Sequence, residues 1–390
     1  MVDSTSTLYL IKGGKLYDPE YSGEKDILIA GDEILRIAEE IPRPEGFDVE
    51  VIDATEGLIV PGFIDSHVHL TGGGGESGFR TRVPEIALSD IIEAGVTTVA
   101  GLLGTDNVTR SPEDLLAKTK ALNETITALA YTGSYHLPSP TITGSVKKDI
   151  ALIDEFIGVK FAISDHRSSQ PSTEELARLA SEARVGGMLG KKPGIVHLHV
   201  GGGSDGLKPI LDVVKDSEIP LTQFVPTHVG RNRELLEQGI ELVNKGGFID
   251  ITCPSESLKW EEGMGSSMER LLEGGAPLSR ITLSSDSNGS MPQFDDEGNL
   301  TGMARGEIRA LFRTVAELAR SDALSLSDAL KLVTENPARR LGVFDRKGNL
   351  AEGKDADILV LTGELELEKV FAGGELLLEG EKTLAGGPFE

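Results

Sequence analysis

Between about residue 58 and residue 286, short apolar runs alternate with segments of helical pattern, and this alternation limits the folds open to the chain. Eight runs can be read, each ending near a polar residue: 58–64, 97–103, 127–132, 157–163, 194–200, 224–227, 247–252 and 281–285. Strands that alternate with helices form parallel sheets. The sequence therefore predicts an α/β fold, most simply a closed (β/α)₈ TIM-like barrel.

Helix start signals support this interpretation. Ser111-Pro112-Glu113-Asp114 places a capping serine before a proline and two acids, which is typical of a first helical turn. Ser325 opens a late helix in the same way. This helix is expected to run through Leu330 and Val333 and to stop before Asn336-Pro337, because the residue before a proline disfavours helix.

The two ends of the chain differ from the middle. Strand-like pieces separated by turn signals occur at 8–12, 26–30, 34–38 and 49–53, and again at 358–361, 369–372 and 375–379. Neither end has enough strands for a core of its own. We therefore expect residues 1–57 and 347–390 to form one small β-sandwich domain, with the barrel, residues 58–346, inserted between them.

Composition excludes several classes of function. The chain has 390 residues and a formal net charge of −25, which disfavours nucleic acid and anionic membranes as partners. It contains no apolar run long enough to span a membrane. Its only cysteine, Cys253, permits no intrachain disulfide, and the first residues do not resemble a secretory signal. A cytoplasmic location is expected.

The pair His67 and His69 closes the first apolar run. Alternate side chains of a strand share a face, so the two imidazoles point the same way at the end of a buried segment and form half of a metal site. The pair alone is weak support, because histidines at strand ends are often hydrogen-bonded core residues. A glycine-rich loop, 72–75, follows and ends at Glu76, where a ligand could approach the backbone closely.

Other strand ends carry further groups able to bind metal. They are His197 and His199 in the fifth run, His228 after the sixth, Asp286 after the eighth, and Lys160 inside the fourth. A lysine within a barrel strand is costly unless it is paired or chemically modified. Together these residues predict a metal site. His199 lies nearer the carboxyl end than His197, for which we expect a structural role, and the roles of His136 and His166 stay open.

The pattern 61–69 with its two histidines, followed by Lys160, His199, His228 and Asp286, resembles the amidohydrolase superfamily with a binuclear metal centre. The match is closer to the isoaspartyl (β-aspartyl) dipeptidase family, through segments across most of the chain: 72–76, 101–106, 132–136, 164–167, 226–232 and 283–290. One departure is Gly230, where asparagine is expected.

This resemblance implies a ligand set. His67 and His69 would bind one metal ion with Asp286, and His199 and His228 would bind a second. Two Zn²⁺ ions per subunit are implied, bridged by a carbamylated (carboxylated) Lys160 and a hydroxide. The bridging hydroxide would attack the isopeptide carbonyl, and Asp286 would pass its proton to the leaving amine.

The resemblance also implies how a β-aspartyl dipeptide, with one ammonium and two carboxylates, is bound. Glu76 would meet the ammonium, Arg167 and Arg231 the carboxylates, and Tyr135 the developing oxyanion. Further contacts would come from Gly74, Thr105 and Ser290. The attraction is then local, which reconciles an anionic substrate with an acidic chain. The family further implies a homo-oligomer, an octamer.

Two alternatives stay open. Another binuclear amidohydrolase, such as a dihydropyrimidinase-like cyclic amide hydrolase or a deacetylase, would share the metal ligands but would not need Glu76 together with Arg167 and Arg231. A catalytically inactive scaffold on the same fold would act by protein association and would typically lack ligands, whereas every expected ligand is present here.

Overall fold

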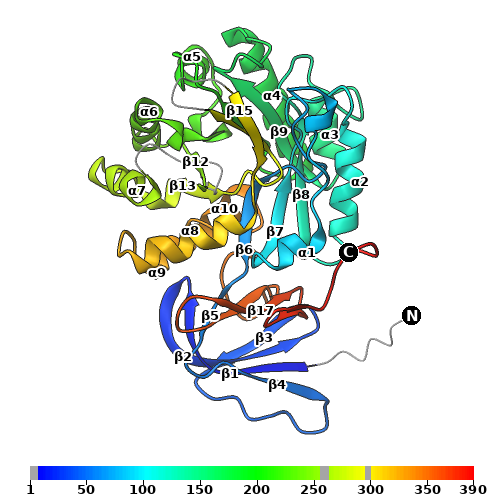
Figure 1. Ribbon diagram of the computed structural model, residues 1–390, viewed down its shortest axis with the longest axis vertical. Coiled ribbons are helices and arrows are strands. Elements are labelled where there is room, and N and C mark those ends of the chain that lie inside the picture. The colour runs from blue at the N-terminus through cyan, green and yellow to red at the C-terminus, as the bar shows by residue number, and fades with distance from the viewer. Residues whose placement is uncertain (1–7, 255–262, 295–299) are drawn as a thin grey trace.

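The computed structural model describes residues 8–254, 263–294 and 300–390, which form a barrel stacked on a smaller sheet (Figure 1). The middle of the chain supplies the barrel, and the blue and red segments from the two chain ends form the sheet below it. The predicted α/β class, with a TIM-like barrel and a small β-domain built from both termini, is confirmed.

Eight strands form the barrel: β6 (Phe63–Val68), β7 (Val96–Gly101), β8 (Thr127–Gly133), β9 (Phe156–Ile163), β10 (Ile195–Val200), β11 (Phe224–Thr227), β12 (Ile249–Thr252) and β13 (Ile281–Ser284). Strands β6 to β11 form one parallel sheet, and β12 pairs in parallel with β13. The ring closes because β11 packs beside β12 and β13 beside β6, where Val68 and Ser287 form a parallel bridge.

The first predicted run, 58–64, is divided, which corrects its assignment to a single barrel strand. β5 (Leu58–Pro61) pairs with β1 (Leu8–Asp18) and β16 (Ile358–Leu361) of the terminal sheet, and only β6 belongs to the barrel. Gly62 separates the two strands, and a Cβ there would lie 2.2 Å from Thr97 Oγ1. The run looks continuous in sequence because both strands are buried. The predicted domain boundaries at 57/58 and 346/347 stay a prediction.

Helices cover the outer face of the barrel (Figure 1). They are α1 (Leu88–Ile92), α2 (Pro112–Leu122), α3 (Val146–Leu152), α4 (Thr173–Gly190), α5 (Lys208–Asp216), α6 (Arg233–Asn244), α7 (Gly263–Glu273), α8 (Arg309–Arg320), α9 (Leu326–Lys331) and α10 (Glu335–Leu341). Ser111 caps α2 as predicted, since its side chain accepts a hydrogen bond from the Asp114 amide at 3.2 Å. Among the described residues no helix has both the length and the apolar character needed to cross a bilayer.

The late helix differs from the prediction at its end. Ser325 caps α9 as expected, but α9 ends at Lys331, and Asn336-Pro337 lies inside the first turn of α10. Pro337 is tolerated there because the amide groups of a first turn have no intrahelical acceptor.

The terminal sheet is mostly antiparallel and has its own apolar core. Besides β1, β5 and β16 it contains β2 (Glu20–Ala30), β3 (Glu33–Ala38), β4 (Val49–Asp53), β17 (Leu367–Ala372), β18 (Glu375–Glu379) and β19 (Lys382–Thr383). Ile11, Ile29 and Ile59 pack in this core with Ile358 and Phe371, so both chain ends contribute to it. Neither end of the chain supplies this whole core by itself.

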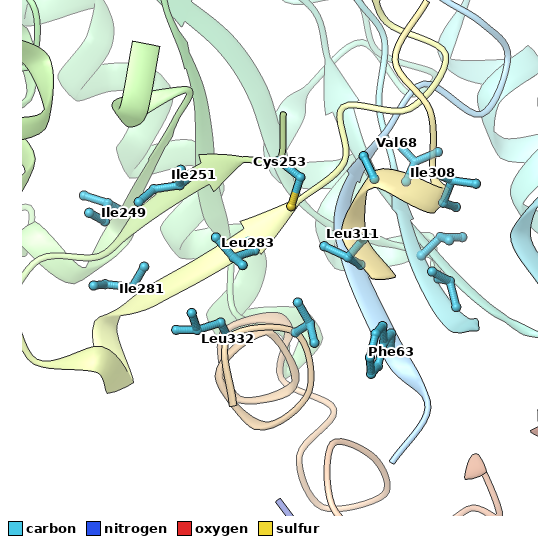
Figure 2. Close-up of a cluster of buried hydrophobic side chains, with 14 of the residues drawn as sticks. Phe63, Val68, Ile249, Ile251, Cys253, Ile281, Leu283, Ile308, Leu311 and Leu332 are labelled. Carbon is cyan, nitrogen blue, oxygen red and sulfur yellow. The ribbon is translucent and has the colours of Figure 1, made fainter. Parts of the chain in front are cut away.

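Barrel strands alternate between an outer and an inner face. On β12, Ile249 and Ile251 belong to the core between strands and helices, part of which Figure 2 shows with Cys253, Leu283 and Leu311. A second apolar cluster unites residues of several barrel strands, among them Ile157 and Ile195 near the amino ends of β9 and β10, with Ala338 and Leu341 of α10. The helix α10 therefore closes the amino end of the barrel, and the opposite end is left for the site.

Above that apolar layer the barrel holds a polar one, centred on the fully buried Asp250 of β12. Its carboxylate accepts hydrogen bonds from Thr227, Thr282 and Ser284, each at 2.6 Å, and from Ser66 at 3.3 Å. Asp250 lies on β12, and the four hydroxyls come from its neighbours β11 and β13 and from β6, which lies beside β13. Asp250 thus links β12 and β13 to β6 and β11, the two end strands of the main sheet.

A hairpin, β14 (Ser290–Phe294) and β15 (Leu300–Arg305), follows the last barrel strand. It begins at Ser290, directly beyond Asp286, and so belongs to the end of the barrel where the strands finish.

Candidate active site

Three groups converge at the carboxyl ends of β6 and β13. Nε2 of His67 and Nε2 of His69 each lie 3.2 Å from the same oxygen, Oδ1 of Asp286. Neither contact has hydrogen-bond geometry, and Nδ1 of His69 is also buried without a hydrogen-bond partner among the described residues. Buried polar atoms are normally satisfied. The ligand atoms of His67, His69 and Asp286 lie within 4.8 Å of one another. Such atoms, facing one another without a hydrogen bond between them, could coordinate a metal cation placed among them.

His67 is held by a histidine from deeper in the barrel. Its Nδ1 lies 2.9 Å from Nε2 of His197, whose ring stacks on Tyr131 at 4.9 Å between centroids. Burial, with the charge of Lys160, lowers the pKa of His67 to about 3. The ring is therefore neutral at physiological pH, as a metal ligand must be, and His197 fixes its orientation.

Lys160 lies on β9 with its side chain fully buried beside this cluster. Its Nζ is 3.5 Å from Nε2 of His67, and in the described part of the chain no carboxylate oxygen lies within 4.0 Å of it. Burial lowers the pKa of Lys160 to about 7. A substantial fraction of this amine is therefore neutral, and hence nucleophilic, at neutral pH.

The second pair of histidines comes from β10 and the end of β11. The rings of His199 and His228 lie 4.6 Å apart between centroids, and His67 lies 5.2 Å from His228. Nδ1 of His228 is 2.6 Å from Oγ1 of Thr252. His228 adopts a left-handed φ of 64°, which turns its side chain out of the strand pattern. Burial lowers the pKa of both rings well below the ordinary value, so both are neutral.

His199 has two further partners. Its Nδ1 lies 2.6 Å from the hydroxyl of Tyr135, and its Nε2 lies 2.8 Å from Oδ2 of Asp165. Asp165 was not predicted as a site residue. The signal in the sequence is an acid at the end of a barrel strand, two residues before Arg167. Thr252, the partner of His228, was also missed, because threonine in a strand is ordinary.

Arg167 and Glu76 meet although they are 91 positions apart. The guanidinium donates to Asp165 from Nε at 2.9 Å and from one Nη at 2.8 Å, and from the other Nη to Glu76 at 3.3 Å. Ser290 donates to Glu76 at 3.0 Å. Burial raises the pKa of Asp165, but the hydrogen bonds from Arg167 outweigh burial and hold this pKa well below its usual range. Asp165 thus aims Arg167 while leaving one edge of it for another anion.

Two more predicted residues border the same space. The guanidinium of Arg167 lies over the ring of Tyr135, 5.5 Å from its centroid. Arg231 follows β11 in the turn Val229–Arg231, with its side chain partly in solvent, and the charges of Arg167, Asp165 and Asp286 act on it. The mouth therefore places two guanidinium groups beside the histidine cluster.

The glycine-rich loop is fixed by its neighbours. Gly74, at φ 78°, forms an isolated bridge with Arg82, and a Cβ there would lie 2.4 Å from the carbonyl oxygen of Thr81. At Gly72 a Cβ would lie 2.1 Å from the carbonyl oxygen of Val83. At Gly72 and Gly74 the backbone leaves no room for a Cβ, and Glu76 follows this closely packed segment at the mouth.

The structure brings together most but not all of the predicted residues. Thr105 lies on the loop after β7, and its side chain forms no hydrogen bond to the other described site residues. His166 is exposed, with a side chain 89% accessible, and only its Nδ1 approaches the site, 3.7 Å from Oδ1 of Asp165. Nδ1 of His136 has no hydrogen-bond partner among the described residues. In the part of the chain that the structure describes, neither forms a hydrogen bond to His67, His69, His199 or His228.

Comparison with known proteins matches residues 58–377 to the amidohydrolase family. A dihydroorotase of Streptococcus thermophilus (strain CNRZ 1066) is 26% identical over 408 aligned residues, which cover 90% of each sequence.

Among solved structures, this chain resembles a β-aspartyl dipeptidase from Fervidobacterium islandicum AW-1 in complex with a β-Asp-Leu dipeptide. The two are 43% identical with a TM-score of 0.89, over 97% of this chain and 99% of that one. A dihydropyrimidinase from Brevibacillus agri NCHU1002 has a TM-score of 0.66 at 15% identity, which shows a shared fold alone.

Proposed function

This chain belongs to the amidohydrolase family, and we propose that it is a metal-dependent dipeptidase that hydrolyses β-aspartyl (isoaspartyl) dipeptides. The observation that carries the proposal is the Arg167–Glu76 pair beside the histidine cluster. It offers a cation and an anion 3.3 Å apart at the mouth, which matches a substrate with an ammonium and carboxylates. The likeness to a dipeptidase over nearly the whole chain supports it.

We propose that the site holds two divalent metal ions, and that they are zinc. Ligand atoms of His67, His69 and Asp286 converge and fit one ion, and Oδ1 of Asp286 has no hydrogen-bond partner among the described residues. His199 and His228 fit a second, provided that His199 gives up its contact with Asp165 or Tyr135. When bound, the metal ions would supply a hydroxide at neutral pH and polarise the substrate carbonyl.

As a carbamate, Lys160 would offer two anionic ligand oxygens to the metal ions held by the histidines and Asp286. Its neutral amine adds to CO₂, a new N–C bond forms, and one proton leaves the nitrogen. The product is an anion with two ligand oxygens, which replaces a cation that has no carboxylate partner in the described part of the barrel. The lowered pKa of Lys160 supports the reaction, because only the neutral amine attacks CO₂.

The remaining roles belong to side chains at the mouth. Glu76 binds the substrate ammonium, and Arg167 and Arg231 bind its carboxylates, with backbone and hydroxyl contacts from Gly74, Thr105 and Ser290. Tyr135 donates its phenolic proton in a hydrogen bond to the developing oxyanion. Asp286 accepts a proton from the attacking water and delivers it to the leaving amine. In the free enzyme Arg167 and Glu76 neutralise each other, and the substrate replaces that pair.

The proposal is tested by steady-state turnover of β-Asp-Leu by the metal-loaded enzyme, with α-Asp-Leu, hydantoin and dihydroorotate as comparison substrates. We expect β-Asp-Leu to be hydrolysed with a kcat/KM at least ~10³-fold above the others. Preference for a cyclic amide would instead assign the chain to the hydrolases that the dihydroorotase similarity suggests. No turnover, with less than about one metal ion per chain, would favour an inactive scaffold.

Glu76→Gln separates substrate binding from metal binding. Because the amide keeps the size of Glu76 but loses its charge, we expect kcat/KM for β-Asp-Leu to fall by ~10²-fold while metal content stays unchanged. The matched control is Glu113→Gln on the exposed surface of α2, which should leave both quantities unchanged. Loss of metal in step with activity would move Glu76 into the metal site.

Tyr135→Phe removes one hydroxyl next to His199. We expect kcat to fall by ~10²-fold with little change in KM, because the hydrogen bond strengthens only as charge develops on the oxygen. Tyr17→Phe in the terminal sheet is the control. A rise in KM at constant kcat would show that Tyr135 serves ground-state binding instead.

Two further properties stay proposals. We propose a cytoplasmic enzyme, since the only cysteine of the chain, Cys253, is buried and reduced. We also propose a homo-oligomer, which size-exclusion chromatography with light scattering would test.

A further inference from the structure

A second cavity lies at the end of the barrel opposite the histidine cluster. It has a volume of about 420 Å³, and its lining includes Lys191 and Lys192, just before β10, Arg184 of α4, and Arg339 and Arg340 of α10. The rest of the lining is uncharged. Strands β10 and β11 begin at this cavity, whereas the metal-ligand candidates follow their other ends. It is therefore separate from the proposed active site.

The lining of this cavity is positively charged, whereas the chain as a whole is negatively charged. Acidic residues outnumber basic ones by 63 to 38 in the sequence, yet five basic side chains and no acidic one line the cavity. Some of them already have partners. Lys192 donates to the carbonyl oxygens of Ile150 and Ile153, and Arg339 pairs with Glu335 at 2.6 Å. Contacts within the protein therefore satisfy only some of the positive charges that line this cavity.

Arg340 is a basic side chain of this cavity whose charge has no anionic partner among the described residues. It forms no hydrogen bond or ion pair with any described residue, and its Nε is enclosed and unsatisfied. Its guanidinium lies 4.7 Å from the ring centroid of Phe248, and that of Arg280 lies 4.9 Å from the same centroid. Burial lowers the pKa of Arg340 to about 10, so it stays charged at physiological pH. A partly buried cation without an anion is unfavourable, and an anionic ligand would relieve it.

We propose that this cavity binds the phosphoryl group of a small molecule, either inorganic phosphate or a phosphate monoester. Several converging cations favour a dianion over a single carboxylate, and the planar guanidinium fork of Arg340 matches a tetrahedral oxyanion. Lys191, exposed at the rim, adds a flexible charge, and Arg184, held to Gln223 at 3.2 Å, borders the opening. The volume exceeds that of a phosphate and leaves room for an organic group.

Isothermal titration calorimetry on the metal-loaded protein, at constant ionic strength, tests this proposal with three probes: inorganic phosphate, ribose 5-phosphate and acetate. We expect saturable binding of the phosphoryl probes and none of acetate at the same concentration. Tighter binding of ribose 5-phosphate than of phosphate would identify a monoester site, and the reverse order would identify a site for free phosphate. Equal binding of acetate, or no saturable binding of either phosphoryl probe, would overturn the proposal.

Variants locate the binding. Arg340→Met and the exposed-rim variant Lys191→Met should each weaken phosphoryl binding, by at least ~10-fold for Arg340→Met. Lys245→Met, on the surface after α6, should leave it unchanged, as should Arg231→Met at the active-site mouth. All except Arg231→Met should keep the wild-type turnover of β-Asp-Leu, so failure here is distinct from failure of the proposed function. Loss of binding in Arg231→Met alone would place the anion at the mouth and overturn the assignment.

Discussion

Replacing Lys160 with alanine is expected to give a folded protein with less than about one metal ion per chain and a β-Asp-Leu turnover lowered by ~10³-fold or more. Lys160 is fully buried, and its Nζ lies 3.5 Å from Nε2 of His67. Without its carbamate the two metal ions would lose their shared anionic ligand and would repel each other across the site. Metal analysis and steady-state kinetics measure the two effects together.

The cavity left by this substitution provides a sharper test. Formate, acetate and propionate each carry a carboxylate that can occupy the space of the missing carbamate, so one of them should restore part of both metal content and activity. Lys147→Ala, on the exposed part of α3, is the control and should respond to none of these acids. If no acid restores metal binding in Lys160→Ala, the carbamate is wrong and Lys160 acts as a buried amine.

Asp250→Ala is expected to lower the free energy of unfolding by ~3–5 kcal/mol, the largest stability effect among these predictions. Asp250 accepts hydrogen bonds from four hydroxyls that are themselves buried, on Ser66, Thr227, Thr282 and Ser284. Removing the carboxylate leaves those donors without their acceptor and opens a cavity in the polar layer. Three of these residues, Ser66, Thr227 and Ser284, lie one or two positions from His67, His228 and Asp286, so metal affinity should fall as well.

Urea unfolding of the metal-free protein isolates the stability effect from metal binding. Asp250→Asn keeps one acceptor oxygen and the volume, and should cost less than the alanine variant. Asp216→Ala, at the exposed end of α5, should change the free energy of unfolding by less than ~0.5 kcal/mol. Wild-type stability in Asp250→Ala would show that the hydroxyls find other partners and that the anion does not hold the ring together.

The barrel was predictable because its strands are short, buried and separated by helices with clear start signals. The positions of His67, His69 and Asp286 follow from the same reasoning, since the ends of parallel strands meet at one edge of a barrel. The terminal sheet was predictable in outline, because neither end of the chain carries enough strands to bury a core.

Other features depend on contacts between distant residues, which no local pattern records. Gly62, between β5 and β6, packs so closely against Thr97 that a Cβ would clash with that side chain. Asp165 gains its importance from His199, 34 positions away, and Arg340 is notable only because nothing in the described structure neutralises it. In each case the sequence supplies an ordinary residue, and packing gives it an unusual environment.

The glycine-rich loop has a consequence for how such an enzyme can diverge. Gly72 and Gly74 cannot accept even a methyl group without moving the backbone at Val83 or Thr81. Substitution of Gly72 or Gly74 is therefore expected to displace the backbone that leads to Glu76. Changes in substrate preference during evolution are therefore expected in the hairpin that begins at Ser290 or in the turn that carries Arg231. Selectivity for the substrate ammonium would be the last property of the pocket to drift.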